Sequence, residues 1–303
     1  MLRNGFLWLS KNQLIRSWME SSPIANRLTS RFIAGLTLDA GLTVASDLAK
    51  QGVHTALDHL GENVSTQHEA KSASDSALMA LARLQELGIG GTIAIKLTQF
   101  GLDLSIDECI DNIEPLVVQA KQSGTRVEVD MESTAYTERT FRIVESMHAK
   151  HGSVRAVIQA YLHRSEEDIR HLNSLGVPVR LCKGAYNESP EFAMTDKTKV
   201  DEAYVRLMRL LLKDGTDAAI ATHDPAIIDQ TVAFAKELGI SQKKFEFEML
   251  FGVRRDLQKQ LVSEGFRLRL YVPYGEAWYP YFMRRLAERP ANVWFLVRNL
   301  TSN

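Results

Sequence analysis

Residues 126–161, RVEVDMESTAYTERTFRIVESMHAKHGSVRAVIQAY, contain the repeat that decides the fold. A β-favouring run occupies 126–131, a helical pattern follows at 137–151, and a second β-favouring run occupies 154–161. A strand, a helix and a second strand in this order are typical of a parallel βαβ unit. The stretch therefore predicts parallel strands that are joined by helices.

The same alternation continues on both sides of this stretch. Further strands are predicted at 53–57, 92–97, 178–183, 217–223, 244–250 and 267–272. Further helices are predicted at 38–51, 75–87, 106–123, 200–213, 226–238 and 276–288. Eight such units over about 240 residues match a (β/α)8 TIM-type barrel, because a doubly wound sheet more often has fewer strands. We expect an α/β fold with an N-terminal helical arm at 1–36 and a single barrel at 37–303.

The composition excludes several classes of protein. The 303 residues are 45% hydrophobic and 24% charged, which excludes a disordered tail, a collagen and a disulfide-dense secreted module. A net charge of -1 makes a nucleic-acid partner unexpected. Cys109 and Cys182 lack metal-type spacing and fit a reducing compartment, the cytoplasm. No apolar run reaches the roughly 18 residues that a membrane span needs.

The charge is unevenly distributed along the chain. The N-terminal arm has five basic residues, Arg3, Lys11, Arg16, Arg27 and Arg31, against the single acidic residue Glu20. The arm therefore has a charge of about +4 and the remainder about -5. With Trp8 and Trp18 it resembles a basic amphipathic helix, for which three interpretations are open. It is a transit peptide, a helix on a membrane surface, or a helix packed on the barrel.

Polar residues alternate with apolar ones along three predicted strands. They are Arg126, Glu128, Asp130 and Glu132 in one strand, Glu246 and Glu248 in the second, and Arg267, Arg269 and Tyr271 in the third. Side chains of a barrel strand point alternately inward and outward, so the apolar members contact the helices and the polar ones point inward. Unpaired charges there would cost several kcal/mol, so they need partners.

Position along the strands divides these residues into two groups. Glu128, Glu246 and Arg267 lie low in the barrel, and we expect them to form salt bridges with one another. Barrel active sites are built at the carboxyl ends of the strands. The candidates there are Lys96, Asp130, Gln159, Arg180, Glu248, Arg269 and Tyr271. Lys96 either forms a Schiff base or is an ion-paired anchor beside Asp130.

The last predicted helix has two adjacent stripes. Tyr281, Arg284, Arg285 and Glu288 share one face, and Trp278, Phe282 and Leu286 form an apolar stripe that can pack on the barrel. The two arginines form either a clamp for a small carboxylate or phosphate, or a solvated basic face. The histidines form no HxH or HExxH pair, so no metal site is expected.

Seven motifs at the strand ends and in the last helix resemble those of one family. They are LGENV at 60–64, KLTQFGLDL at 96–104, DME at 130–132, QAYL at 159–162, RLCKGAY at 180–186, ATHD at 221–224 and YFMRRLAERPAN at 281–292. On these motifs the sequence resembles the flavin-dependent proline dehydrogenases of the short monofunctional bacterial type. The resemblance implies a distorted barrel that binds FAD and oxidises L-proline to 1-pyrroline-5-carboxylate, the first step of proline catabolism.

The resemblance also implies roles for individual residues. Arg284, Arg285 and Lys96 would bind the proline carboxylate, and Glu62 would pair with Arg284. Tyr271, Tyr281 and Leu250 would pack around the proline ring. Arg180 would lie near the flavin N5, and Asp130 would hold Lys96 in place. The residues that would contact FAD are Met131, Gln159, Arg180, Lys183, Gly184, Ala185, Thr222, His223 and Glu288.

The family passes its electrons to a membrane quinone, so the resemblance implies a quinone partner. The basic arm is then a candidate for peripheral contact with the inner face of the cell membrane. A separate pyrroline-5-carboxylate (glutamate semialdehyde) dehydrogenase is a further candidate partner. Two alternatives to this function stay open: a Schiff-base lyase or aldolase that uses Lys96, and a non-catalytic barrel that senses an amino acid through Arg284 and Arg285.

Overall fold

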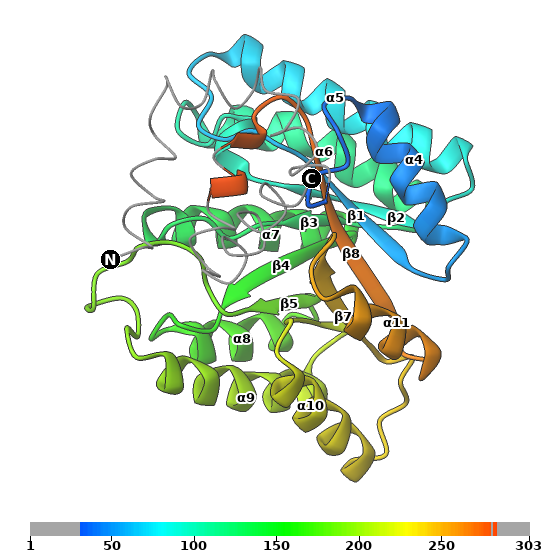
Figure 1. The fold of residues 1–303 in the computed structure, drawn as a ribbon. Helices are drawn as coiled ribbons and strands as arrows, with labels where there is room; N and C mark the ends of the chain where they lie inside the picture. Colours follow the sequence, from blue (N-terminus) through cyan, green and yellow to red (C-terminus); the bar gives the residue numbers. More distant parts are fainter. Residues whose placement is uncertain (1–30, 280, 284–303) are drawn as a thin grey trace, which may run out of the picture.

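The computed structural model of the protein describes residues 31–279 and 281–283 (Figure 1). Eight parallel strands form a closed barrel in which each strand pairs with the next, and β1 also pairs with β8. The strands are β1 (His54–His59), β2 (Gly91–Ile95), β3 (Val127–Val129), β4 (Val154–Gln159), β5 (Val179–Cys182), β6 (Ala218–Ala221), β7 (Phe245–Leu250) and β8 (Leu268–Tyr274). The predicted barrel is confirmed.

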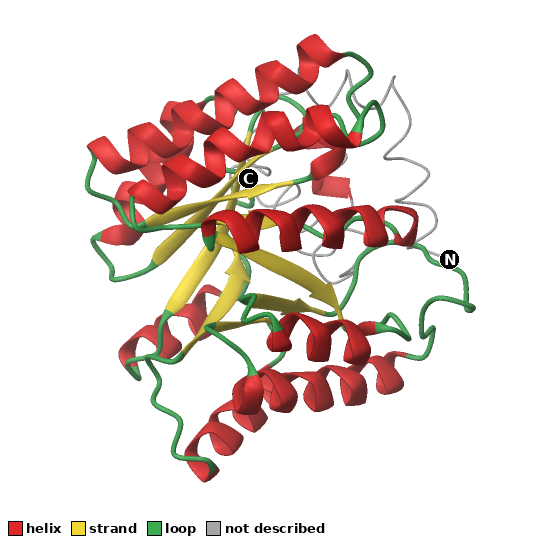
Figure 2. Ribbon diagram, turned by 180° about the vertical axis from the view of Figure 1, so that it is seen from behind, coloured by secondary structure: helices red, strands yellow, loops and turns green. Residues whose placement is uncertain are grey.

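The helices lie around the outside of the barrel (Figure 2). They are α4 (Leu38–Ala49), α5 (Gln67–Glu86), α6 (Ile106–Gln122), α7 (Thr137–His151), α8 (Ser165–Ser174), α9 (Lys197–Asp214), α10 (Pro225–Glu237) and α11 (Arg255–Ser263). Two short 3-10 helices, Leu97–Phe100 and Thr134–Tyr136, follow β2 and β3. Among the described helices, none has both the length and the apolar character that a membrane span requires.

Local sequence signals explain where several helices begin. Thr66 and Glu69 form a reciprocal capping box at the start of α5, so two backbone N–H groups of the first turn find acceptors. Asp196 caps α9, and Asp224 caps α10 directly before a proline at the first helical position. The β6–α10 connection is therefore short and fixed, which holds the segment after β6 at the mouth of the barrel.

The apolar faces of the strands pack against the helices. Val127 and Val129 of β3 are at most 1% exposed and belong to the main core, which lies between the strands and the surrounding helices. The intervening Glu128 is fully buried and contacts charged residues of other strands, so it points into the barrel. The alternation predicted from the sequence is confirmed, and it places the charged side chains inside.

A second apolar cluster lies beside β1, at the carboxyl end of the barrel. Its members are Phe32, Ile33, Leu60, Trp278, Tyr279, Tyr281, Phe282 and Met283. Trp278 and Phe282 contact each other with ring centroids 6.0 Å apart, which confirms the apolar stripe for these two residues. The backbone of residues 34–35 also hydrogen-bonds to the end of β8 and to Gly275. Residues 32–35 are therefore packed on the barrel.

Candidate active site

A cleft of about 530 Å³ opens at the carboxyl ends of the strands. Residues that end or follow β2 through β8 line it, so the barrel closes seven strand ends around one space. Fourteen of the predicted site residues lie in this lining: Lys96, Asp130, Met131, Gln159, Arg180, Lys183, Gly184, Ala185, Thr222, His223, Glu248, Leu250, Tyr271 and Tyr281. Its volume is in the range of about 300–1,000 Å³ that is usual for cofactor and ligand sites.

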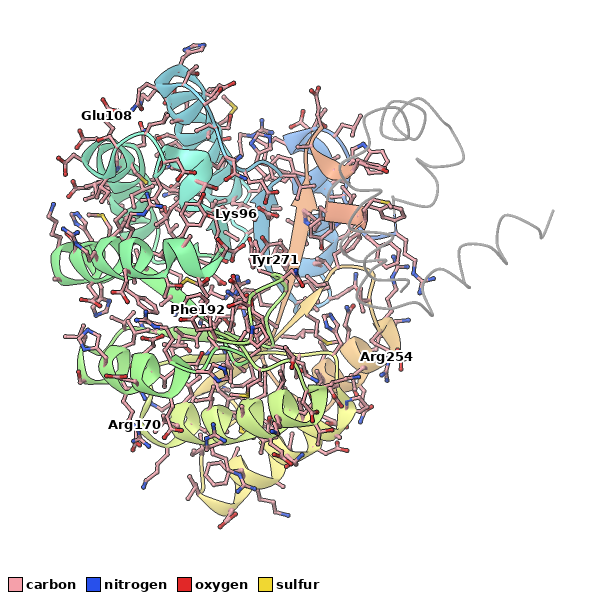
Figure 3. All side chains as sticks on the ribbon, turned by 90° about the vertical axis from the view of Figure 1, so that its left-hand side faces the viewer. Lys96, Glu108, Arg170, Phe192, Arg254 and Tyr271 are labelled. Carbon is pink, nitrogen blue, oxygen red and sulfur yellow. The ribbon has the colours of Figure 1, made fainter. Side chains whose placement is uncertain are left out.

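Lys96 lies at the centre of a group of polar contacts, close to Tyr271 (Figure 3). Its Nζ is 3.1 Å from Asp58 Oδ1 and 3.6 Å from Asp130 Oδ2, and it donates to the Tyr271 hydroxyl at 3.4 Å. Burial alone would lower the pKa of Lys96, but the two carboxylates outweigh burial and raise that pKa above its usual range. Lys96 is therefore an ammonium at neutral pH, which removes the support for a Schiff-base lysine.

Asp130 joins three other cleft residues. The Tyr271 hydroxyl donates to Asp130 Oδ2 at 2.8 Å, and the Arg180 guanidinium donates to Asp130 Oδ1. The guanidinium also lies over the Tyr271 ring, 5.3 Å from its centroid. Burial raises the pKa of Tyr271 well above its usual range, so the phenol stays protonated. The floor of the cleft therefore combines two fixed cations with a neutral hydroxyl.

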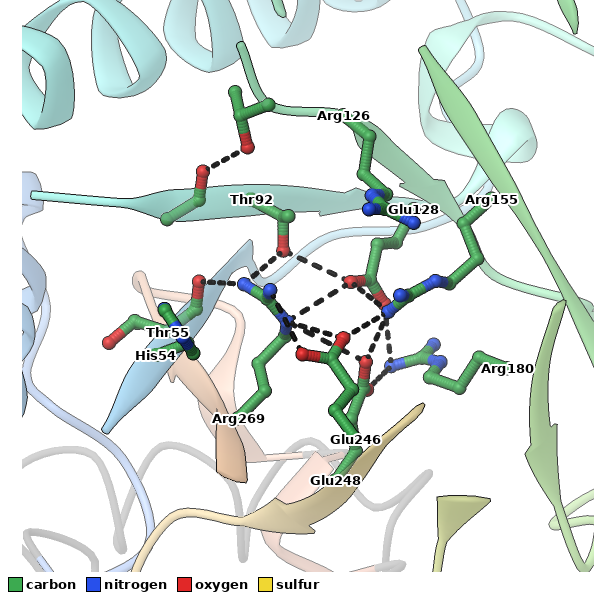
Figure 4. Close-up of polar contacts among 12 residues, drawn as sticks. His54, Thr55, Thr92, Arg126, Glu128, Arg155, Arg180, Glu246, Glu248 and Arg269 are labelled. Atoms are coloured by element: carbon green, nitrogen blue, oxygen red, sulfur yellow. Dashed lines mark hydrogen bonds and ion pairs between the residues drawn. The ribbon is translucent and has the colours of Figure 1, made fainter. Parts of the chain in front are cut away.

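Below the cleft, six residues form what we call the interior lattice: Glu128, Arg155, Arg180, Glu246, Glu248 and Arg269 (Figure 4). Arg155 is fully buried, and its Nη1 donates to Glu128 at 3.2 Å, to Glu246 at 2.5 Å and to Glu248 at 2.9 Å. Burial and the neighbouring Glu128 raise the pKa of Glu248, whereas Arg269 and Arg155 overcome burial and lower the pKa of Glu246. Of the predicted mutual salt bridges, that between Glu246 and Arg267 is confirmed at 3.3 Å, whereas Glu128 pairs with the arginines of the lattice instead of Arg267.

The segment after β5 forms one side of the cleft. Gln159 Nε2 donates to the Glu132 carbonyl at 2.9 Å, and Gln159 Oε1 accepts from the Ala185 N–H at 3.3 Å. Gly184 has a φ of 119°, and a Cβ there would lie 2.2 Å from the Tyr161 ring. A side chain cannot be placed at this position without moving the ring. The backbone of 184–185 is therefore held close to the cleft by contacts that require glycine.

His223 and Lys183 are also fixed by specific contacts. His223 Nε2 accepts from the Leu250 N–H at 2.8 Å, so this ring nitrogen carries no proton. Lys183 Nζ pairs with Asp201 and, at 3.0 Å, with Asp224. His223 is therefore positioned by the end of β7, whereas Lys183 is held both by α9, the helix that follows its own strand, and by Asp224 after β6.

Some predicted site residues are not brought together by the described structure. Glu62 follows β1 and is not among the residues that line the cleft. Arg284, Arg285 and Glu288 lie outside the described residues. The assignment of Arg269 to the mouth of the barrel is wrong: its guanidinium binds Glu246 at 3.0 Å and the Thr55 carbonyl at 3.2 Å, because it points down into the interior lattice.

Two important residues were missed in the sequence. Asp58 pairs with Lys96, but the first strand was predicted to end at residue 57, whereas β1 runs to His59. Arg155 is the hub of the interior lattice, and it lies four residues before Gln159 on the same face of β4. Since side chains an even number of positions apart on a strand share a direction, an inward Gln159 also indicates an inward Arg155.

Comparison with known proteins decides the family. Residues 42–298 match the family model described as proline dehydrogenase. The chain belongs to the proline dehydrogenase family. It is 39% identical to proline dehydrogenase 2 of Bacillus subtilis (strain 168), over 99% of this chain and 98% of that one. It is 36% identical to a proline dehydrogenase of Deinococcus radiodurans, over 90% of each chain.

Solved structures agree with this family. Proline utilization A (PutA) from Bdellovibrio bacteriovorus, inactivated by N-propargylglycine, has a TM-score of 0.80 and 25% identity. The match covers 87% of this proline dehydrogenase and 33% of that chain, so the chain spans about a third of the length of the solved relative. The predicted activity, oxidation of proline by a flavin-dependent family, is thereby confirmed. The lyase and sensor alternatives are set aside.

Proposed function

We propose that this proline dehydrogenase holds FAD in the cleft and there oxidises L-proline to 1-pyrroline-5-carboxylate. The observation that carries the proposal is the polar group on the cleft floor, in which Asp130 joins Arg180, Tyr271 and Lys96. Two fixed cations close to a carboxylate and a phenol suit a site that must bind the carboxylate of an amino acid and stabilise electron transfer from its ring.

The residues of the cleft fit a flavin. Arg180 lines the cleft, and its Nε is buried without a hydrogen-bond partner in the described protein, so a donor is available for an acceptor atom of a bound group. The close backbone approach at Gly184 leaves room where any side chain would intrude. Met131, Gln159, Lys183, Ala185, Thr222 and His223 would hold the flavin together with these two residues. We assign Glu288 to the same group from the sequence motif.

Lys96 would bind the proline carboxylate. Its ammonium is kept charged by Asp58 and Asp130 and is oriented by the Tyr271 hydroxyl. Arg284 and Arg285 would complete a bidentate clamp, with Glu62 paired to Arg284. The apolar surfaces of Leu250, Tyr271 and Tyr281, which line the cleft, would then enclose the pyrrolidine ring. The site would thus have a charged end for the carboxylate and an apolar end for the ring. These two ends would fix the orientation of proline, as in other small-ligand sites.

When bound, FAD would supply a two-electron oxidant for the C–N bond between the ring CH2 and the nitrogen, which loses a hydride from carbon and a proton from nitrogen. The share of the protein is alignment and charge. Asp130 keeps both Lys96 and Arg180 in place, because one carboxylate oxygen faces each cation. Arg180 holds a permanent positive charge where electron density would accumulate, which favours the oxidation electrostatically. Asp130 and Arg180 are therefore the residues to which we assign the catalytic role.

We further propose a quinone in the membrane as the electron acceptor. The basic N-terminal arm, whose residues 1–30 lie outside the described structure, would contact the inner face of the cell membrane while the enzyme itself is cytoplasmic. The product is a reactive cyclic imine. A pyrroline-5-carboxylate (glutamate semialdehyde) dehydrogenase would consume it, which makes the reaction the first step of proline catabolism.

Two measurements test this proposal. The purified protein should be yellow, and L-proline should bleach it in the absence of oxygen; a colourless protein, or one whose colour proline does not change, would exclude the proposed cofactor chemistry. Arg285→Ala should raise the proline KM by about 10- to 100-fold while FAD stays bound, because a charge-assisted pair contributes about 1.5–3 kcal/mol. An unchanged KM would remove Arg285 from the clamp.

A further inference from the structure

The interior lattice reaches the cleft through only some of its members. None of its six side chains is more than 8% exposed. Glu248 and Arg180 line the cleft, whereas Glu128, Arg155, Glu246 and Arg269 are not among the described residues that line it. Glu248 and Arg180 are thus the point at which the charges inside the barrel meet the charges of the proposed flavin site.

Glu248 connects the interior lattice to the cleft through its two carboxylate oxygens. Its Oε1 accepts from Arg155 at 2.9 Å, and its Oε2 accepts from Arg180 at 3.2 Å. Arg155 is in turn fixed by Glu128 and Glu246 (Figure 4). It also donates to Asp217 at the base of the barrel. Glu248 is therefore held rigidly from below, and it can transmit that rigidity to the guanidinium above it.

The Arg180 guanidinium is held on two sides. Asp130 accepts from Nη2 at the cleft floor, and Glu248 accepts from Nη1 below, with Glu128 Oε2 3.5 Å from the same nitrogen. Asp130 also serves Tyr271 and Lys96, so it would have to adjust when substrate binds. Among the described residues, Glu248 hydrogen-bonds to Arg155 and Arg180 rather than to Tyr271 or Lys96. Unlike Asp130, Glu248 therefore anchors Arg180 from the side of the interior lattice, and it is closer to Arg180 Nη1 than Glu128 is.

We propose that Glu248 is a positioning residue for proline oxidation, which fixes the Arg180 guanidinium from inside the barrel and thereby sets the redox potential of the bound flavin. The inference rests on the proposed place of Arg180 beside FAD. Glu248 acts through Arg180 and the fixed lattice, so its effect falls on the flavin rather than on proline binding. A planar guanidinium is sensitive to such an anchor, because both of its outer nitrogens must be placed at once.

Glu246 offers a matched control. It lies two residues earlier in β7, points to the same side, is fully buried and also accepts from Arg155, at 2.5 Å. Its other partners are Arg267 and Arg269, and it is not among the residues paired with Arg180. Shortening either glutamate to aspartate preserves charge and disturbs the same lattice. Only the change at 248 withdraws a carboxylate from Arg180.

The test compares Glu248→Asp with Glu246→Asp in the full-length flavin-loaded enzyme. For Glu248→Asp we expect the equilibrium constant for reduction of the flavin to decrease about tenfold. The midpoint potential would then be about 30 mV lower, because the couple transfers two electrons. Anaerobic reduction by proline should slow, and the proline KM should change by less than about twofold, because the carboxylate clamp is untouched. Glu246→Asp should keep the wild-type potential while losing comparable thermal stability. A wild-type potential in Glu248→Asp, or equal shifts in both variants, would overturn the inference.

Arg180→Lys separates this inference from the proposed function. A lysine keeps the charge but cannot bind Asp130 and Glu248 with two separate nitrogens in one plane. We expect it to lower the potential at least as much as Glu248→Asp. If Arg180→Lys leaves the potential unchanged, the proposed role of Arg180 fails and the inference fails with it. If Arg180→Lys lowers the potential and Glu248→Asp does not, the inference alone fails.

A second pair of variants serves if Glu248→Asp does not give folded holoenzyme. Glu248→Gln and Glu246→Gln keep the side-chain volume and each remove one carboxylate from the lattice. Loss of a negative charge should raise the potential in both. The change at 248 also removes an anchor of Arg180, which lowers the potential, so the inference requires the flavin reduction equilibrium of Glu248→Gln to lie at least threefold below that of Glu246→Gln. Equal shifts would mean that the lattice acts on the flavin only through its total charge, which would contradict a positioning role.

Discussion

At the scale of single residues, the hydroxyl of Tyr271 connects the two cations of the cleft floor. It accepts from Lys96 and donates to Asp130, and Asp130 in turn binds Arg180. A phenol suits this position because burial keeps it neutral, so it can donate and accept at the same time. Removal of the hydroxyl would take away the shortest contact of Asp130 Oδ2, which is 2.8 Å long. It would also remove one of the groups that orient Lys96 toward the cleft.

We therefore expect Tyr271→Phe to lower kcat/KM for proline by about 10- to 100-fold, since a hydrogen bond to a charged group contributes about 1.5–3 kcal/mol. Steady-state kinetics on the flavin-loaded enzyme measure this effect. Tyr204→Phe is the control: its hydroxyl donates at 2.8 Å to the Leu181 carbonyl, is buried, and lies on the helix side of β5. It should lower thermal stability without changing the kinetics. Equal kinetic effects of the two variants would contradict the assigned role of Tyr271.

Gly184 gives a second prediction at this scale. Its φ of 119° and the Tyr161 ring, 2.2 Å from where a Cβ would lie, leave no space for a methyl group. Gly184→Ala should therefore displace the cleft wall and reduce the FAD content of the purified protein by more than about half, because strained or overpacked positions cost about 1–3 kcal/mol. Gly176→Ala is the control. Gly176 also has a positive φ, 72°, but no atom lies within 4 Å of where its Cβ would be. This variant should retain full FAD content, and a loss of FAD there would show that backbone strain alone explains the effect.

At the scale of secondary-structure elements, the start of β6 closes the lower end of the barrel. Asp217 directly precedes this strand with a φ of 45°, and it binds Arg126 at 2.5 Å, Arg155 at 3.1 Å and Arg267 at 2.8 Å. One carboxylate thus binds arginines from β4 and from the residues that precede β3 and β8. Burial alone would raise the pKa of Asp217, but these arginines outweigh burial and lower that pKa.

The sign of the pH dependence follows from this lowered pKa. Asp217 contributes its full stabilisation above the unfolded-state pKa of about 3.9 and loses it as the pH falls through the lower folded-state value. Asp217→Asn, which tolerates the positive φ, should lower the free energy of unfolding at neutral pH by about 1.5–3 kcal/mol. The deficit should shrink below about pH 4, because the wild type then loses the same charge. Urea unfolding at neutral and acid pH measures both values.

Asp75→Asn is the matched control for this prediction. Asp75 pairs with Lys71 on the surface of α5 at 3.1 Å, with 61% of its side chain exposed. An exposed pair of this kind contributes about 0–1 kcal/mol, so its loss should scarcely change the free energy of unfolding at either pH. A deficit for Asp217→Asn that stays constant down to acid pH would mean that the substituted amide, rather than the lost charge, destabilises the barrel.

The elements also show how far the sequence determines the site. Periods of two and 3.6 residues predicted eight strands and six of the surrounding helices, because each element buries a single face. Helices α8 and α11 were not singled out, since they have only 10 and nine residues and each buries a narrow stripe. Local patterns cannot say which inward charges meet across the barrel. The pairing of Lys96 with Asp58, and of Arg155 with three glutamates, depends on the closure of β1 onto β8 and on the stagger of the strands.

At the scale of the whole molecule, the two ends of the barrel differ in their use of charge. The lower end is closed by Asp217 and its arginines, and the upper end opens into the cleft. Between them the interior lattice has equal numbers of glutamates and arginines. The barrel interior is thus close to neutral, so the excess basic charge of the chain is concentrated outside it, in the N-terminal arm.

This distribution leads to a prediction about membrane contact. Arg3, Lys11 and Arg16 lie in the segment before residue 31, outside the described residues, while residues 32–35 are packed on the barrel. Changing these three basic residues to Gln leaves the barrel sequence intact. Each basic residue near an anionic surface contributes about 1 kcal/mol to binding, so the triple variant should bind phosphatidylglycerol-containing vesicles about 100-fold more weakly. Sedimentation with vesicles of phosphatidylcholine, with and without phosphatidylglycerol, measures the difference.

The control removes the same charge from the barrel surface by changing Lys50, Lys71 and Arg170 to Gln, whose side chains are 57–75% exposed. If the arm is the membrane contact, this variant should bind vesicles as the wild type does, because its charges are far from the arm in sequence and are not part of the basic helix pattern. Turnover with a soluble quinone should be unchanged in both variants, and turnover with a vesicle-embedded quinone should fall only in the arm variant. Equal losses of binding in the two variants would mean that net charge alone governs the association, and wild-type binding in the arm variant would exclude the arm as the membrane contact.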